Sequence, residues 1–217
     1  MIKLENVTKS YATRTGTKRV LNGINFSMRK GERVGFLGRN GAGKSTLIRI
    51  ISGAELPDSG TVQREMSVSW PLAFGGAFQN SLTGLDNLNF ICRIYGVSAE
   101  GKLEYVQEFS ELGDNIYEPI RTYSAGMRAR LAFAISMVID FDCFLIDEVF
   151  AVGDDRFQRK CHVELFERRA DRGMIFVSHN QHFIREHCDR VAILDQGHAL
   201  AFDDVDEAYH YYMAHYG

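Results

Sequence analysis

An unbroken glycine-rich segment, Gly38-Arg39-Asn40-Gly41-Ala42-Gly43-Lys44-Ser45, is the part of the sequence best suited to chemistry. It fits the pattern GxxxxGK[ST], in which residues without bulky side chains let successive backbone N–H groups surround phosphate oxygens. The pattern assigns Lys44 to the outer phosphates as a point charge and the Ser45 hydroxyl to a Mg²⁺ ion. Because an apolar run ends at Leu37 and helical spacing follows over 44–51, the segment predicts a nucleotide site between a strand and a helix.

Two adjacent acids follow the apolar run Phe144-Leu145-Ile146. A strand over this run brings Asp147 and Glu148 to the carboxyl edge of a sheet, where open α/β folds bind nucleotides. Asp147 can hold Mg²⁺ directly or through water, and Glu148 can orient or deprotonate an attacking water. Apolar runs followed by two acids are also common at solvated strand ends, so this interpretation depends on the phosphate loop in the same chain.

A capped helix start is the third candidate element, at Thr122-Tyr123-Ser124-Ala125-Gly126-Met127-Arg128. Ser124 stands in the N-cap position, so the helix after it presents backbone donors and the positive end of its dipole. By itself this pattern predicts only a capped helix. Further along, the apolar run Met174 to Val177 predicts a strand that ends just before Ser178 and His179.

Hydrophobic periodicity divides the chain into three stretches. Residues 1–81 and 139–217 read as strands and helices, which predicts a parallel α/β core. Residues 82–138 have helical spacing and predict a helical lobe inserted into that core, so that the whole chain, 1–217, forms one domain. The last helix carries a stripe of tyrosines and Met213, which we interpret as core packing: Tyr209, Tyr212 and Tyr216.

Charge and apolar content exclude some classes of protein. The 217 residues include 25 basic and 28 acidic side chains, and the net charge of −3 argues against nucleic acid as the main partner, because a phosphate backbone favours a basic face. The longest apolar run, 131–139, has about half of the roughly 20 residues that cross a bilayer. Since residues 1–11 also lack the apolar segment of a secretory signal, we expect a cytoplasmic protein.

The order of these elements resembles the ATP-binding subunits of ABC transporters over essentially the whole chain. A phosphate loop, a helical lobe, a Ser-x-Gly helix start, an Asp-Glu strand and a strand before His179 follow one another as in that family. The resemblance implies an α/β fold with a P-loop NTPase core of the RecA-like type, an antiparallel β-subdomain and an inserted α-helical subdomain. It also implies an ATP hydrolase that works as a homodimer, in which each ATP is held between the two copies.

The family pattern implies a role for each matching residue. Tyr11 would stack on adenine, Glu148 would be the catalytic glutamate, and His179 would sense the γ-phosphate. Ser124 and Gly126 match the signature that contacts the partner's ATP, although the neighbouring residues depart from the usual LSGGQ. The residues implied to bind ATP within one copy are Gly38, Asn40, Gly41, Ala42, Gly43, Lys44, Ser45, Thr46 and Asp147, with Ser45 and Asp147 as the Mg²⁺ ligands.

One segment departs from the family pattern. Many relatives have a glutamine near position 74 that contacts Mg²⁺ and the attacking water, and this sequence has Ala73-Phe74-Gly75-Gly76 there. Gln79 lies several residues later, and the sequence leaves open whether it takes that role. The surrounding aromatic segment, Trp70 to Phe78, is our candidate for a groove that receives a cytoplasmic helix of a membrane permease.

Two segments, 68–79 and 146–154, narrow the resemblance to ATPases that export capsular polysaccharide from Gram-negative bacteria. This implies a peripheral location at the cytoplasmic face of the inner membrane. The implied partners are a polytopic permease, a periplasmic co-polymerase and an outer-membrane export protein. An exporter of O-antigen or another cell-surface polymer is the main alternative.

Two other classes fit the sequence less well. An ABC ATPase that acts on ribosomes or DNA usually carries two cassettes or a long coiled coil, and this chain has neither. A P-loop kinase or small GTPase would have no role for the Ser124 helix or for His179.

Overall fold

A computed structural model describes residues 1–72, 78–147, 154–178 and 181–216 of the chain. By internal contacts the chain divides into two compact units, each of which is described by itself. The sheet unit comprises Met1–Pro71, Phe141–Glu148 and Asp171–Gly217, and the helical unit comprises Leu72–Asp140 and Val149–Ala170. The helical lobe expected over 82–138 falls within the helical unit, which also takes in the helical segment after residue 154.

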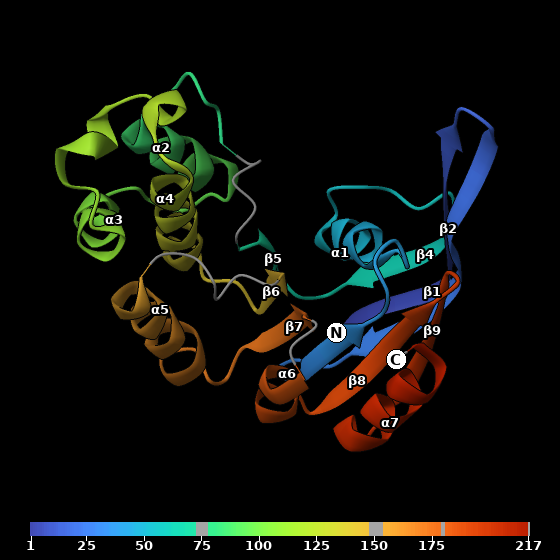
Figure 1. The fold of residues 1–217 in the computed structure, drawn as a ribbon. Coiled ribbons are helices and arrows are strands. Elements are labelled where there is room, and N and C mark those ends of the chain that lie inside the picture. Colours follow the sequence, from blue (N-terminus) through green and yellow to red (C-terminus); the bar gives the residue numbers. More distant parts are fainter. Residues whose placement is uncertain (73–77, 148–153, 179–180, 217) are drawn as a thin grey trace. The chain divides into compact units, whose positions relative to one another are not determined.

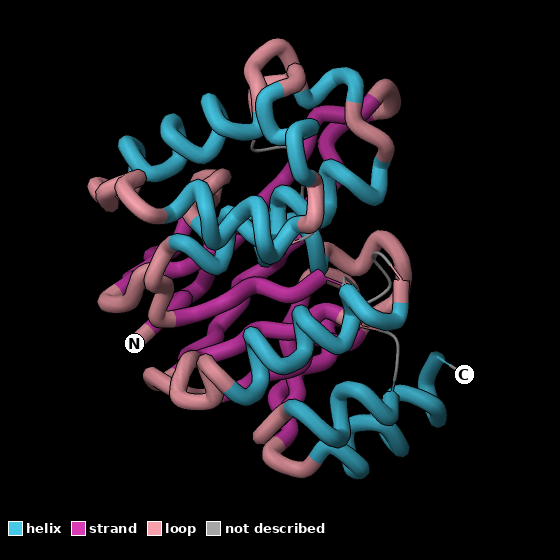
Figure 2. The backbone as a smooth tube through the Cα atoms, turned by 90° about the vertical axis from the view of Figure 1, so that its left-hand side faces the viewer, coloured by secondary structure: helices cyan, strands magenta, loops and turns pink. Residues whose placement is uncertain are grey.

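The sheet unit contains two β-sheets, whose strands lie side by side in Figure 2; all of them except β3 are labelled in Figure 1. The antiparallel sheet has the order β2-β1-β4, with β1 at Ile2–Thr13, β2 at Gly16–Met28 and β4 at Ser59–Arg64. The other sheet has the order β5-β6-β7-β3-β8-β9, and its pairs are parallel except for β8 with β9. Its strands are β3 (Arg33–Leu37), β5 (Val68–Pro71), β6 (Cys143–Asp147), β7 (Gly173–Val177), β8 (Arg190–Asp195) and β9 (His198–Phe202). The predicted parallel core and antiparallel sheet are confirmed.

One hydrophobic core joins both sheets to helix α1 (Lys44–Ser52). Val34 and Phe36 of β3 are fully buried, as expected for an apolar strand in the middle of a parallel sheet. Leu47, Ile50 and Ile51 of α1 are also fully buried, so the apolar spacing predicted for this helix faces the core. The start of α1, and with it the end of the glycine-rich loop, is therefore fixed by packing.

Helices α6 (Gln181–His187) and α7 (Val205–Tyr216) complete the sheet unit. α7 packs against α6, β8 and β9, and its buried residues are Ala208 and Tyr209. Farther along the helix, Met213 is 61% exposed, and the rings of Tyr212 and Tyr216 pack on each other with centroids 5.3 Å apart. The interpretation of the stripe as core packing is therefore confirmed for Tyr209 and wrong for Met213, while Tyr212 and Tyr216 are half-buried.

The helical unit contains α2 (Gly84–Ile94), α3 (Lys102–Ser110), α4 (Ala125–Val138) and α5 (Asp155–His162). Two short 3₁₀ turns, Gly113–Tyr117 and Ile120–Thr122, precede α4, and a π-helical turn, Val163–Glu167, continues α5. Three rings from α3, α4 and α5 pack together: Phe109 stacks on Phe133 with centroids 5.5 Å apart, and Phe157 meets both edge-on. Among the described residues, no helix is long and apolar enough to cross a membrane.

Candidate nucleotide-binding site

The glycine-rich loop leads from the end of β3 to the start of α1, and two of its glycines are required by the backbone. Gly38 has a φ of +153°, and a Cβ there would lie 2.6 Å from the carbonyl oxygen of Leu194 in β8. Gly43 is the N-cap of α1 with a φ of +107°, and a Cβ there would lie 3.0 Å from the carbonyl oxygen of Val20. A side chain at either position would push the loop away from the strands beside it.

The Lys44 side chain folds back over this loop. Its ammonium group donates to the carbonyl oxygen of Gly38 and, at 3.1 Å, to that of Arg39, and the residue is only 9% exposed. A cation held beside the N-terminus of α1, the positive end of the helix dipole, suits the loop to anions such as phosphates. Of the other predicted loop residues, Asn40, Gly41 and Ser45 are exposed, Ala42 is half-buried and Thr46 is buried.

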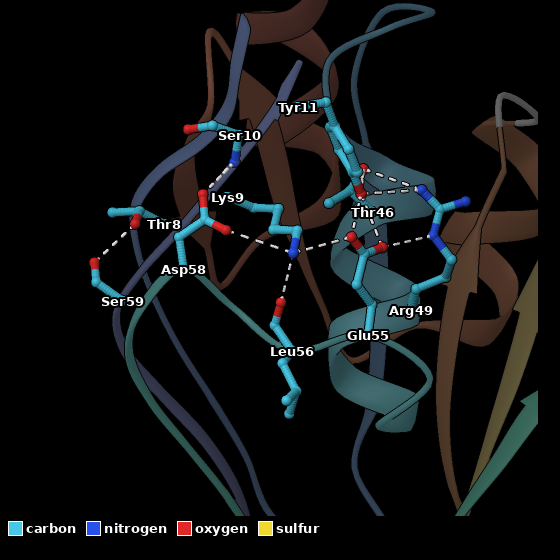
Figure 3. A network of polar contacts seen from close by, with 10 residues as sticks. All are labelled: Thr8, Lys9, Ser10, Tyr11, Thr46, Arg49, Glu55, Leu56, Asp58 and Ser59. Carbon is cyan, nitrogen blue, oxygen red and sulfur yellow. Dashed lines mark hydrogen bonds and ion pairs between the residues drawn. The ribbon is translucent and has the colours of Figure 1, made fainter. Parts of the chain in front are cut away.

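Tyr11, near the end of β1, reaches the same helix (Figure 3). Its hydroxyl lies 2.8 Å from both carboxylate oxygens of Glu55 and 3.3 Å from the Thr46 hydroxyl. Arg49 donates to the same phenol oxygen at 3.3 Å, and the Lys9 ammonium lies over the Tyr11 ring, 5.7 Å from its centroid. The structure thus brings the predicted base-stacking ring to the residue that follows the Lys-Ser pair of the loop.

Glu55 is the centre of these contacts, and sequence reasoning missed it. The Lys9 ammonium lies 3.1 Å from one of its carboxylate oxygens and Arg49 Nε lies 3.0 Å from the other. Burial raises the pKa of Glu55, but hydrogen bonds from Tyr11, Lys9 and Arg49 outweigh burial and hold that pKa below its ordinary value. No sequence signal could have found this residue, because its partners come from β1 and α1.

The Asp-Glu strand ends at the same sheet edge as the loop. Asp147, the last residue of β6, pairs in parallel register with Val177, which pairs in turn with Phe36 of β3. The ends of β6, β7 and β3 are therefore level, which is the arrangement predicted for a carboxylate near the phosphate loop. Glu148 and His179 lie outside the described residues, so their roles stay predictions.

The predicted signature lies at the start of α4 in the helical unit. The Ser124 hydroxyl accepts a hydrogen bond from the Met127 amide at 3.2 Å, which confirms it as the N-cap. Ser124, Ala125 and Gly126 are exposed, and a Cβ on Gly126 would meet only the Ser124 hydroxyl oxygen, at 3.9 Å. Glycine in a helix costs about 1 kcal/mol relative to alanine, and no described residue of the helical unit requires it at Gly126. A close approach from outside would require it.

The segment expected to hold the missing glutamine is described only in part. Residues 73–77 lie outside the described residues, so the permease groove expected over Trp70 to Phe78 stays a prediction. Gln79 has an exposed side chain, and its backbone amide donates to the side chain of Asn87 at 2.9 Å, which fixes the chain before α2. Whether Gln79 serves the nucleotide site stays open.

A phosphate loop at the carboxyl edge of a parallel sheet, combined with a helical unit that carries a capped Ser-x-Gly helix, defines an ATP-binding cassette. The family model described as "ABC transporter" matches residues 21–151. This chain belongs to the ABC transporter family of ATP-binding subunits.

Known relatives and a solved structure agree with this assignment. The chain is 58% identical over 212 residues, 98% of both chains, to the "Capsule polysaccharide export ATP-binding protein CtrD" of Neisseria meningitidis. It is equally similar, again over 98% of both chains, to the "ATP-binding protein BexA" of Haemophilus influenzae. The ATP-binding cassette MJ0796, solved as a dimer with ADP and Pi, has the same fold with a TM-score of 0.78 at 20% identity, covering 94% of this chain and 98% of that one.

Proposed function

We propose that this chain is the ATP-hydrolysing subunit of an exporter of capsular polysaccharide, working as a homodimer at the cytoplasmic face of the inner membrane. The observation that carries the proposal is the 58% identity to CtrD over nearly the whole of both chains. The phosphate loop supports the ATPase part of the proposal independently, because its glycines and Lys44 place a cation beside a helix N-terminus, an arrangement suited to phosphates.

In this proposal the sheet unit binds one ATP. The backbone of Gly38 to Thr46 surrounds the phosphates, Lys44 neutralises the outer two, and Tyr11 stacks on the base. Ser45, whose side chain is exposed at the start of α1, and Asp147 would hold Mg²⁺. When bound, the metal neutralises charge on the phosphate oxygens.

The remaining roles belong to the sheet edge and to the second copy. Glu148 orients or deprotonates the attacking water, and His179 contacts the γ-phosphate. The start of α4, with Ser124 and Gly126, presents backbone donors to the ATP held by the partner copy. Contacts that exist only with a γ-phosphate then favour the closed dimer, and its loss lets the dimer open.

The cargo and the partners follow from the relatives rather than from this site. We propose a polytopic permease that lines the path, together with a periplasmic co-polymerase and an outer-membrane export protein. The test is purification of the tagged chain from native membranes, followed by identification of the proteins and glycan bound to it. We expect a permease and capsular polymer. An O-antigen glycan would replace the proposed cargo, and recovery without any membrane protein would contradict the transport function.

A further inference from the structure

We propose that Glu55 is a positioning residue for nucleotide binding, which holds the Tyr11 ring at a fixed place relative to the phosphate loop. The inference rests on the proposed function, in which Tyr11 stacks on the base of ATP. It adds a residue, outside every motif of the sequence, that decides how well the ring can do so.

Beyond Thr8 the backbone of β1 has a paired strand on one side only, although the Ser10 amide also donates to the Asp58 carboxylate at 2.7 Å. β1 pairs with β2 as far as Thr13, but its pairing with β4 ends at Thr8, opposite Ser59. Tyr11 therefore lies in a two-stranded extension, where neighbouring strands constrain a side chain less than in a three-stranded sheet. The direction of the ring depends on what its hydroxyl contacts.

Within the described part of the chain, the hydrogen bonds of the Tyr11 hydroxyl all go to groups that are joined to the phosphate loop. Thr46 and Arg49 belong to α1, and Glu55 lies in the turn that follows α1 (Figure 3). That turn is itself fixed, because Gly53 caps the end of α1 with a φ of +82° and the Glu55 amide donates to the carbonyl oxygen of Arg49 at 3.1 Å. These contacts connect the Tyr11 ring to α1 and, through α1, to the phosphate loop.

The hydrogen bond to Glu55 is the strongest contact of the Tyr11 hydroxyl. A hydrogen bond from a phenol to an ionised carboxylate is roughly twice as strong as one between neutral groups. The carboxylate is in turn fixed by Lys9 at 3.1 Å and by Arg49 at 3.0 Å, with only 21% of its side chain exposed. Without this anchor the ring would still be present, but ATP binding would have to order it.

The test compares ATP with inorganic tripolyphosphate, which has the phosphates but no base, by calorimetry on the purified chain. We expect Glu55→Gln to raise the Kd for ATP about three- to tenfold, the effect of losing one charged hydrogen bond, and to leave the Kd for tripolyphosphate within about twofold. The matched control is Glu65→Gln in the same unit, where the side chain is 68% exposed and pairs with the chain's N-terminus at 3.6 Å. The control is expected to change neither Kd. Equal weakening of both ligands by Glu55→Gln would overturn the proposal.

A double-mutant cycle shows whether Glu55 acts through the ring. Tyr11→Phe keeps the ring and removes the hydroxyl, so we expect it to weaken ATP binding as much as Glu55→Gln, with no further loss when both changes are combined. Additive losses would overturn the proposal, because Glu55 would then act apart from Tyr11. Tyr11→Phe also carries the test if Glu55→Gln does not fold.

A third variant separates this inference from the proposed function. Tyr11→Ala is expected to lower the preference for ATP over tripolyphosphate at least as much as Tyr11→Phe. If Tyr11→Ala has this effect and neither Tyr11→Phe nor Glu55→Gln does, the result supports stacking by Tyr11 and contradicts the positioning role of Glu55. If Tyr11→Ala changes nothing, the stacking role falls and the positioning role falls with it.

Discussion

The sheet unit and the helical unit each contain a carboxylate bound by one tyrosine hydroxyl and two cations. Glu55 in the sheet unit has 21% of its side chain exposed, and Glu164 in the helical unit has 6%. The partners are Tyr11, Lys9 and Arg49 for Glu55, and Tyr105, Arg168 and Arg169 for Glu164. The two clusters have the same chemistry and differ in what they connect.

The Glu164 cluster connects helices to one another. Tyr105 comes from α3, Glu164 lies in the π-helical turn after α5, and Arg169 also donates to the carbonyl oxygen of Met137 in α4 at 2.8 Å. The Glu55 cluster instead connects a strand end to the helix that carries the phosphate loop. A buried polar cluster is therefore not by itself a sign of a site. What its members are attached to decides whether it serves the fold or the ligand.

The largest expected effect concerns ATP hydrolysis, where the helical unit should contribute only the start of α4. Glu148→Gln is expected to bind ATP but to hydrolyse it at least about a hundredfold more slowly, because the water loses its base.

In the Glu148→Gln background ATP should pair two copies of the chain, measured by light scattering of the purified chain with its membrane partners. Ser124→Arg should abolish the pairing and Glu164→Ala should leave it intact. Near-normal turnover in Glu148→Gln would remove Glu148 from its role.

The next largest effect concerns the stability of the fold, which should depend on the Glu164 cluster. Glu164→Ala is expected to lower the free energy of unfolding by about 3 kcal/mol, because it removes one partner of a mostly buried ion pair, the carboxylate that Arg169 contacts. The Kd for ATP should change less than about twofold, measured beside urea unfolding of the same preparation. Glu167→Ala, an exposed change in the same turn, should cost less than about 0.5 kcal/mol. A loss of ATP affinity in Glu164→Ala would contradict the distinction between the two clusters, because the Glu164 cluster would then also serve the ligand.

The smallest effect is a pH dependence of the Glu164 cluster. Burial raises the pKa of Glu164, but hydrogen bonds from Arg169 and Tyr105 outweigh it and hold that pKa below the ordinary 4.5. Since the folded pKa is the lower one, the stabilisation is complete above pH 4.5 and is lost as the pH falls through the folded value. The difference in unfolding free energy between the wild type and Glu164→Gln should therefore shrink below pH 4.5 in denaturant titrations. A difference that grows on acidification would contradict the assignment.

Local features of the fold and site were predictable because the neighbouring sequence determines them. The loop from Gly38 to Ser45, its strand and its helix follow from glycine, Lys-Ser and apolar spacing, and the Ser124 cap follows from the residue type. The parallel core was predictable because strands and helices alternate along the chain. The roles of Glu148 and His179 stay predictions.

Features that depend on contacts between distant segments were not predictable. The contacts of Glu55 depend on the turn after α1 lying against β1, which the sequence pattern does not reveal. β9 was missed because Gly197 and the mixed residues of 198–202 give no clear alternation, and its place is set by pairing with β8. The grouping of α5 with the helical unit depends on the ring of Phe157 packing on Phe109 and Phe133, and the spacing of these residues does not reveal such packing.

The close approach of Gly38 to the Leu194 carbonyl oxygen has a consequence for how the protein is made. β3, which leads into the loop, pairs with β7 on one side and β8 on the other, and both strands are encoded far downstream of it. A nascent chain that has left the ribosome only as far as β6 therefore carries the loop sequence without the walls that shape it. The shaped loop, and with it nucleotide binding, therefore has to wait until β7 and β8 have been synthesised.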